Sequence, residues 1–330
     1  MGKPNLFDIA TSELSQDGFF TWLLRWAHPA NLKENAELCR CGQDFIKLLL
    51  NAQGKTVTEI TEVKVWRQWQ DIDIWASINE HFAIVLEDKT NTGAAAGQLE
   101  RYRETARAWC AKTEGYDPEP VCVYVKTGSE SKRSLAGIRA KGFAVITRQD
   151  LLGVLENCGT KNAIFQEFVS HLQALEDAEA AYATKPVDKW DWRQWVGFYQ
   201  SLDKDLAGDS KADWRYVSNP AGGFWGFWWH FMPWKNHQVY LQIEQGRLCF
   251  KIEVFSEDKA ALRNEWQSVI LDKAKAQGKT EIVKPKRAGT GEWMTVAVVD
   301  RAQWLGADGS KLDTDAVLAR LKGYEQFLDS

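Results

Sequence analysis

Two carboxylates and a lysine stand close together in one short stretch of this 330-residue sequence, QDIDIWASINEHFAIVLEDKT. The runs DIDIWASI and FAIVLEDKT have the β-branched and aromatic character of strands, and the residues between them predict a tight turn near residue 80. A hairpin symmetric about that turn places Asp73 opposite Glu87 and Asp71 opposite Lys89. Because side chains alternate along a strand, all four then share one face of the sheet.

This combination of residue types suits the hydrolysis of a phosphodiester bond. Magnesium prefers oxygen ligands and keeps several waters, so one or two carboxylates and a substrate phosphate complete its site. A lysine beside the attacking water can orient it or help to remove its proton, and it stabilises charge in the transition state. The alternative is a solvated, charged strand face that occurs by chance. The run AIVL before LEDKT favours burial on both faces, which is less natural for such a surface.

Three further residues extend the predicted site. Gln98 and Tyr102 are four apart in a predicted helix over residues 94–112, so they share one helix face. Glu13 lies in the first turn of a predicted helix over residues 12–27, from where it could reach a metal at the sheet edge. Taken alone, the pair in the 94–112 helix also fits ordinary helix surface and a core aromatic.

The ordered set of these residues resembles the PD-(D/E)XK nuclease superfamily, in the branch with a Q-x-x-x-Y element. In this resemblance Asp73, Glu87 and Lys89 match the D…E-x-K core, while Gln98 and Tyr102 match Q-x-x-x-Y. Glu13 matches the acidic residue of the first helix, and ATSELSQDGFFTWLLRWAHP is similar to the opening of a set of bacterial members of largely undefined role. The family's proline before the aspartate is absent, since Ile72 stands there, and this leaves Asp71 open as an alternative to Asp73 as the metal ligand.

The resemblance covers about residues 1–180 and implies a restriction-endonuclease-like core with magnesium-dependent hydrolysis, with manganese as a substitute ion. It implies that Asp73 and Glu87 hold the cation, with the Leu86 or Asp88 carbonyl as a further ligand, and that Glu13 binds a second ion. It also implies nucleic acid as the substrate, DNA rather than RNA, and a role in defence against foreign DNA or in DNA processing. A catalytically inactive nucleic-acid-binding or scaffold protein on the same fold is the alternative.

The order of elements predicts an α/β domain with a mixed β-sheet flanked by helices over residues 1–182. A change of composition and Pro186 place the domain boundary near residues 183–188. Helices are expected at 12–27, 33–52, 94–112, 149–157 and 162–178, and strands at 57–69, 71–78, 82–90, 120–128 and 142–147.

The second domain, residues 188–330, is predicted to be a smaller α+β unit for recognition or partner binding. Strand-like runs lie at 224–231, 237–244, 247–255 and 293–299, and helical patterns at 257–277 and 313–328. Eleven of the seventeen tryptophans fall in this half. The aromatic segment NPAGGFWGFWWHFMPW is expected mainly to pack a core, with a base-stacking platform as the alternative. A protein partner or a second copy of the chain is expected to bind through this domain.

Composition and charge limit the classes of protein to which this chain can belong. Apolar residues make up 45% and charged residues 26%, which is ordinary for a globular protein, and the net charge of −4 weighs mildly against a sequence-independent nucleic-acid binder. The six cysteines are scattered and predict reduced, mostly buried thiols. The N-terminus lacks the pattern of a secretory signal, so a cytoplasmic location is expected.

Basic residues gather in two stretches, which are either solvated surface or candidates for phosphate contacts. The stretches are Lys126, Lys132, Arg133, Arg139, Lys141 and Arg148, and then Lys273, Lys275, Lys279, Lys284, Lys286 and Arg287.

Overall fold

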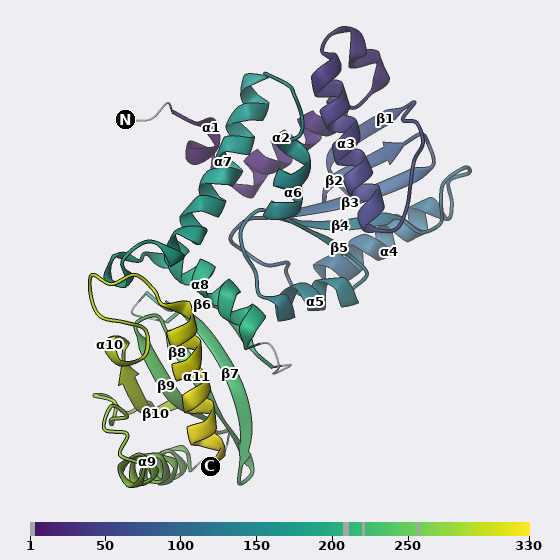
Figure 1. The fold of residues 1–330 in the computed structure, drawn as a ribbon. Coiled ribbons are helices and arrows are strands. Elements are labelled where there is room, and N and C mark those ends of the chain that lie inside the picture. The colour runs from purple at the N-terminus through teal and green to yellow at the C-terminus, as the bar shows by residue number, and fades with distance from the viewer. Residues whose placement is uncertain (1–3, 207–210, 220–221, 256–257) are drawn as a thin grey trace. The chain divides into compact units, whose positions relative to one another are not determined.

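The computed structural model describes residues 4–206, 211–219, 222–255 and 258–330, and the chain divides into two compact units. The first unit comprises Met1–Glu130 with Ser134–Asp177, and the second comprises Ser131–Arg133 with Ala178–Ser330. Each unit has its own five-stranded sheet (Figure 1). None of the described helices combines the length and the apolar character that a membrane-spanning segment requires.

The first sheet is mixed, with strand order β1-β2-β3-β4-β5. The first three strands pair antiparallel, whereas β3, β4 and β5 run parallel. The elements that the chain contributes up to residue 180 are, in order, α1 (Leu6–Ile9), α2 (Glu13–Trp26), η1 (Pro29–Lys33), α3 (Ala36–Ala52), β1 (Val63–Trp69), β2 (Ile72–Ile78), β3 (Phe82–Lys89), α4 (Gln98–Cys110), β4 (Val121–Lys126), α5 (Lys132–Ala140), β5 (Ala144–Thr147), α6 (Arg148–Leu155) and α7 (Ala163–Ala180). The predicted α/β fold with a mixed, helix-flanked sheet is therefore confirmed.

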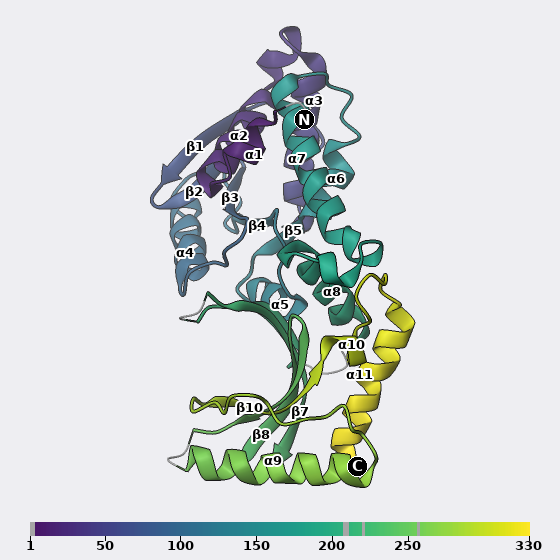
Figure 2. The same cartoon turned by 90° about the vertical axis from the view of Figure 1, so that its left-hand side faces the viewer.

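Helices cover both faces of this sheet, so its central strands are buried on each side (Figures 1 and 2). One face packs its aliphatic side chains against apolar residues of α1, α2, α3, α6 and α7. The other packs against α4, with Leu99 and Tyr102 buried beside Trp75 and Val85. All eight residues of β3 are buried, which explains its continuous apolar sequence. A charged side chain at the end of this strand is therefore held in a largely dry environment.

The β2–β3 hairpin has the predicted register. Ile74 pairs with Leu86 and Ile78 with Phe82, so Asp73 stands at the position opposite Glu87. The expectation for Asp71 was wrong: it precedes β2 in the turn after β1, is exposed, and has a φ of 66°. A residue in a tight turn does not continue the alternation of the strand, so Asp71 does not lie opposite Lys89.

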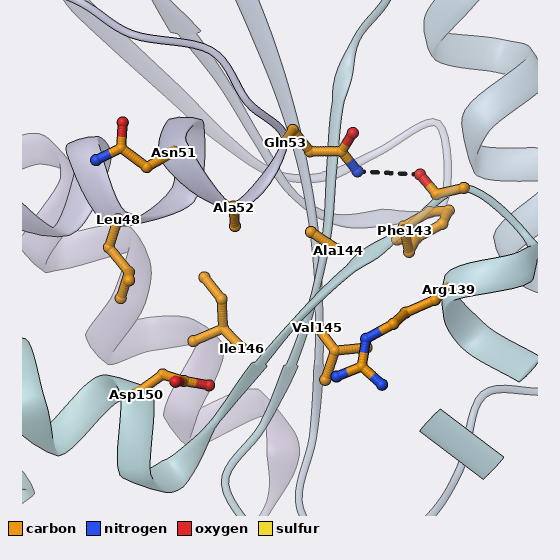
Figure 3. Close-up of a pocket in the computed structure, with 11 residues that line it drawn as sticks. Leu48, Asn51, Ala52, Gln53, Arg139, Phe143, Ala144, Val145, Ile146 and Asp150 are labelled. Carbon is orange, nitrogen blue, oxygen red and sulfur yellow. Dashed lines mark hydrogen bonds between the residues drawn. The ribbon is translucent and has the colours of Figure 1, made fainter. Parts of the chain in front are cut away.

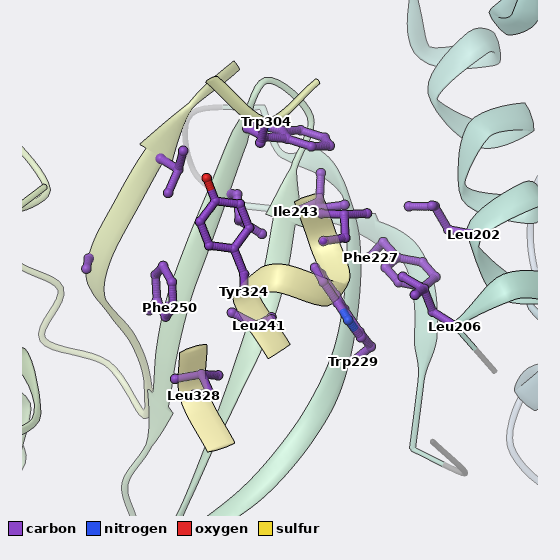
Figure 4. Packing of buried hydrophobic residues seen from close by; sticks show 14 of the residues in the cluster. Leu202, Leu206, Phe227, Trp229, Leu241, Ile243, Phe250, Trp304, Tyr324 and Leu328 are labelled. Carbon is purple, nitrogen blue, oxygen red and sulfur yellow. The ribbon is translucent and has the colours of Figure 1, made fainter. Parts of the chain in front are cut away.

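The second sheet is antiparallel throughout, in the order β10-β9-β8-β7-β6. The elements of this unit are η2 (Ala181–Ala183), η3 (Val187–Lys189), α8 (Trp192–Asp205), β6 (Asp213–Val217), β7 (Phe224–Trp234), β8 (His237–Glu244), β9 (Arg247–Glu253), α9 (Lys259–Ala276), β10 (Trp293–Asp300), α10 (Arg301–Trp304) and α11 (Thr314–Asp329). Phe227, Trp229 and Leu241 on one face pack into a core with Trp304 and Tyr324 (Figure 4). The opposite face of this sheet carries polar and aromatic side chains instead.

The sequence did not predict helices α5 and α8 or strand β6. Residue 257, the first of the predicted helix 257–277, and residues 220 and 221 of the aromatic segment lie outside the described residues.

Candidate active site

Strands β2 and β3 and helix α2 bring three carboxylates to one lysine at the end of the first sheet. The Nζ of Lys89 lies 2.6 Å from Oε1 of Glu87, 3.3 Å from Oε2 of Glu13 and 3.7 Å from Oδ2 of Asp73. It also donates a hydrogen bond to the carbonyl of Asp88 at 3.1 Å. The structure thus brings together four of the residues that the sequence singled out.

Each carboxylate is positioned by its own local structure. Glu87 and Lys89 are two residues apart in β3, so their side chains point to the same side of the sheet. The side chain of Glu87 is fully buried. Glu13 is the first residue of α2, and its Oε1 accepts hydrogen bonds from the hydroxyl of Thr92 at 2.6 Å and the amide of Thr90 at 3.4 Å. Asp73 is the second residue of β2, next to Ile74, whose pair with Leu86 is the last between β2 and β3.

Gln98 joins the cluster through Glu87. It is the first residue of α4, and its Nε2 donates to Oε1 of Glu87 at 2.8 Å and to the Tyr102 hydroxyl oxygen at 3.0 Å. Its own Oε1 accepts from the amide of Ala95 at 3.0 Å, which fixes the orientation of the amide group. The predicted shared face of Gln98 and Tyr102 is therefore turned toward a carboxylate. Among the described residues, neither side chain forms a hydrogen bond with Lys89.

Burial and crowding of like charges shift the protonation of this cluster. Burial, followed by the neighbouring Asp73 carboxyl, raises the pKa of Glu87 to about 8. Burial opposes the charge of Lys89, but the carboxylates of Glu87, Asp73 and Glu13 outweigh it and raise the pKa of the ammonium group. Hydrogen bonds, chiefly from Thr92, overcome the effect of burial and lower the pKa of Glu13. Lys89 therefore carries its proton here.

Two further buried acids, which sequence reasoning missed, lie in the same electrostatic neighbourhood. Burial and the charge of Asp73 raise the pKa of Asp17 to about 7. Asp88 is fully buried, and burial and the charge of Asp17 raise its pKa well above the usual range. Among the described residues, neither oxygen of Asp88 nor Oδ1 of Asp17 has a hydrogen-bond partner. Asp17 could have been predicted as a neighbour of the site, because it follows Glu13 by four residues and therefore shares its helix face.

The first basic stretch does not form one surface for phosphates. Lys126 and Arg148 are buried, with 3% and 1% of their surface exposed. Lys126 Nζ donates to the carbonyl of Thr92 at 2.6 Å, and Arg148 pairs with Glu176 at 2.8 Å. For these two residues the phosphate-contact hypothesis was wrong, because both side chains are buried and bonded to partners within the protein.

A hollow of about 600 Å³ lies beside strand β5, one of the two edge strands of the first sheet (Figure 3). Its lining includes Arg139 and Asp150, and Gln53 donates a hydrogen bond across it to the carbonyl of Gly142 at 3.0 Å. No residue that the sequence singled out for catalysis lines it, so the charged cluster at β3 is the stronger candidate for chemistry.

The mixed five-stranded sheet and its flanking helices define an α/β fold of the restriction-endonuclease-like type. A family model described as the PD-(D/E)XK nuclease superfamily matches residues 4–182, which is more than half of the chain. The chain therefore belongs to the PD-(D/E)XK nuclease superfamily. No curated protein and no solved structure matches it.

Proposed function

We propose that this protein is a divalent-metal-dependent nuclease that hydrolyses phosphodiester bonds of DNA, with its catalytic site at Asp73, Glu87 and Lys89. The observation that carries the proposal is the convergence of three carboxylates on one ammonium nitrogen, all within 3.7 Å of it, in a chain of this superfamily. The second unit then serves recognition or partner binding, and the biological setting is defence or DNA processing.

The donor chemistry of the cluster suits magnesium, with manganese as its substitute. Glu87 has a buried oxygen, Oε2, without a hydrogen-bond partner in the described part of the chain, and the nearby Asp73 raises the pKa of its carboxyl group. A divalent cation relieves this repulsion in place of a proton. Within the described ranges no group of three or more His, Cys, Asp or Glu residues is arranged to hold a metal. Magnesium, however, needs only one or two carboxylates beside water and phosphate.

In this proposal Asp73 and Glu87 hold the ion, and Glu13 binds a second ion directly or through water. The ion supplies polarisation of the phosphoryl oxygen and acidity to a nearby water molecule.

Lys89 and the α4 residues act on the substrate and on the carboxylates. The raised pKa of Lys89 keeps its ammonium group protonated, so it serves as a hydrogen-bond donor to the attacking water or to a phosphate oxygen, and it stabilises the charge that develops there. Gln98 fixes Oε1 of Glu87 and so leaves Oε2 directed at the proposed ion site. Tyr102 holds Gln98 in place from the next helical turn.

A cleavage assay tests the proposal. The full chain is incubated with linear duplex, circular duplex and single-stranded DNA in magnesium or manganese. Lys89→Ala should reduce the rate at least a hundredfold, since an electrostatic donor at the reacting group is typically worth about 10²–10³ in rate. Lys64→Ala is the control, because Lys64 on β1 also pairs with a carboxylate, 2.6 Å from Glu80 in the β2–β3 turn, but lies outside the site. Equal rates for Lys89→Ala and the parent would overturn the assignment.

One observation favours the inactive alternative: the Lys89 ammonium already compensates part of the charge of the three carboxylates without any metal. Calorimetry with manganese near neutral pH separates the two cases. Heat of binding that Glu87→Gln removes supports the nuclease, whereas no binding by the parent protein supports a scaffold.

A further inference from the structure

The second unit contains a large groove on the face of its sheet that the core does not use. Its volume is about 970 Å³, near the upper end of the range of about 300–1,000 Å³ that is usual for ligand pockets. All of its lining residues belong to this unit. Alternation along β8 sends Leu241 and Ile243 into the core, and Tyr240 and Gln242 into the groove.

Aromatic rings line this face, although an antiparallel sheet usually turns a polar face to water. Trp228 and Trp293 border the groove, and 57% of the Trp293 surface is exposed. Phe231 stacks on Tyr240 with ring centroids 4.8 Å apart and an interplanar angle of 20°. A ring that stays as exposed as that of Trp293 can stack on a planar ligand.

A β-bulge in β7 places Phe231 in the groove. The register with β8 shifts between Trp229 and Met232, and His230 within the bulge has a φ of 56°. Without the extra residue, Phe231 would follow Phe227 and Trp229 onto the core face, because odd positions of this strand point there. Bulges turn side chains in this manner, and a non-glycine residue at positive φ is uncommon. The aromatic segment is therefore divided between the core and the groove.

The charges of the groove favour an anionic ligand. The guanidinium carbon of Arg215 lies 5.3 Å from the ring centroid of Trp228, and Arg215 has no ion pair or hydrogen bond among the described residues. Lys211 places its Nζ 5.7 Å from the Phe231 ring centroid. Each cation thus stands beside an aromatic ring, an arrangement that suits a phosphate next to a stacked base.

The carboxylates of the groove have partners within the protein. Glu244 accepts from Lys251 at 3.1 Å, and Glu253 accepts from the Trp293 indole at 2.8 Å. Asp213 accepts from the amide of Trp214 at 2.8 Å. Their charge is therefore partly compensated, whereas that of Arg215 is not.

We propose that this groove binds single-stranded DNA, with unpaired bases stacked on its aromatic rings and phosphates held by Arg215 and Lys211. Bases in a duplex are stacked on each other and cannot offer their faces, so the groove should discriminate against double strands. The choice of DNA rests on the proposed function, and the groove itself is independent of the residues proposed for catalysis.

Fluorescence anisotropy of a labelled oligothymidylate with the full chain tests this proposal in EDTA, so that no cleavage is required. We expect Trp293→Ala to weaken binding by about 5- to 150-fold, the range typical for loss of one stacking contact, and Arg215→Ala to weaken it through loss of a phosphate contact. A duplex of equal length should bind at least tenfold more weakly than the single strand.

Matched controls come from a second cation–aromatic pair in the same unit. The guanidinium carbon of Arg193 lies 4.4 Å from the Trp192 ring centroid, and neither residue lines the groove. Arg193→Ala and Trp192→Ala should leave the affinity unchanged. Any of four results would overturn the proposal. These are no binding by the parent, equal affinity for the duplex, an equal loss of affinity in the control variants, and tighter binding of the corresponding RNA. Loss of cleavage in Lys89→Ala with unchanged oligonucleotide affinity would separate this site from the proposed nuclease site.

Discussion

The buried carboxyl group of Glu87 makes the metal-free protein sensitive to pH in an unusual direction. Its pKa rises from the ordinary value of 4.5 to about 8 because of burial and the neighbouring Asp73. Between these two values the folded protein binds a proton that the unfolded chain has released, so stability falls as pH rises. One proton gives a slope of at most about 1.4 kcal/mol per pH unit. From pH 5.5 to 7.5, Glu87 therefore lowers the free energy of unfolding by up to about 3 kcal/mol.

Glu87→Gln tests this expectation because glutamine keeps the shape and removes the titrating proton. In EDTA, urea unfolding is followed by hydrogen exchange of peptides from the first unit, which separates its unfolding from that of the second. The parent should lose stability between pH 5.5 and 7.5, and the variant should lose up to about 3 kcal/mol less. Asp17, with a pKa raised to about 7, contributes a slope of the same sign to both proteins. Asp44→Asn, at an exposed ion pair with Lys47, is the control. Identical slopes for the parent and Glu87→Gln would refute the reasoning.

Three other outcomes are expected. Magnesium at pH 8 should raise the unfolding temperature of the parent but not of Asp73→Asn, because the ion replaces the proton shared by the carboxylates; equal shifts in a thermal melt would contradict this. Gln98→Ala should reduce metal affinity or activity by roughly 10- to 100-fold in a magnesium titration of cleavage, since it orients a ligand, and an unchanged titration would argue against that role. Gly42→Ala should lower the free energy of unfolding by about 1–3 kcal/mol in urea unfolding, because a Cβ there would lie 2.5 Å from the Leu23 carbonyl oxygen. Gly18→Ala, where a Cβ would have nothing within 4 Å, should leave this free energy unchanged or raise it.

The hairpin of the proposed site could be predicted because its sequence restricts it at several levels. A turn near residue 80 and alternation on either side allow few registers, and a shift by one residue would bury the wrong face. The register of Ile74 with Leu86 follows from these constraints. Asp71 could not be placed in the same way, because the positive φ of the preceding turn ends the alternation.

The contacts of the cluster depend on tertiary packing, which local patterns do not encode. Asp17 lies near Asp73 only because α2 packs against the sheet. The sequence around Lys126 suggests an exposed cation, but the packing of β4 buries its side chain. Helix α5 was not predicted because its short sequence is rich in charged residues. The bulge that turns Phe231 away from the core cannot be predicted from the alternation of side chains along a strand.

Crystals of the full chain soaked in manganese test the central claim most directly. An anomalous peak within about 2.1 Å of carboxylate oxygens of both Asp73 and Glu87, with the Lys89 ammonium moved from between them, is the expected result. A peak bound to only one of these carboxylates, or none near them at saturating manganese, would contradict the account.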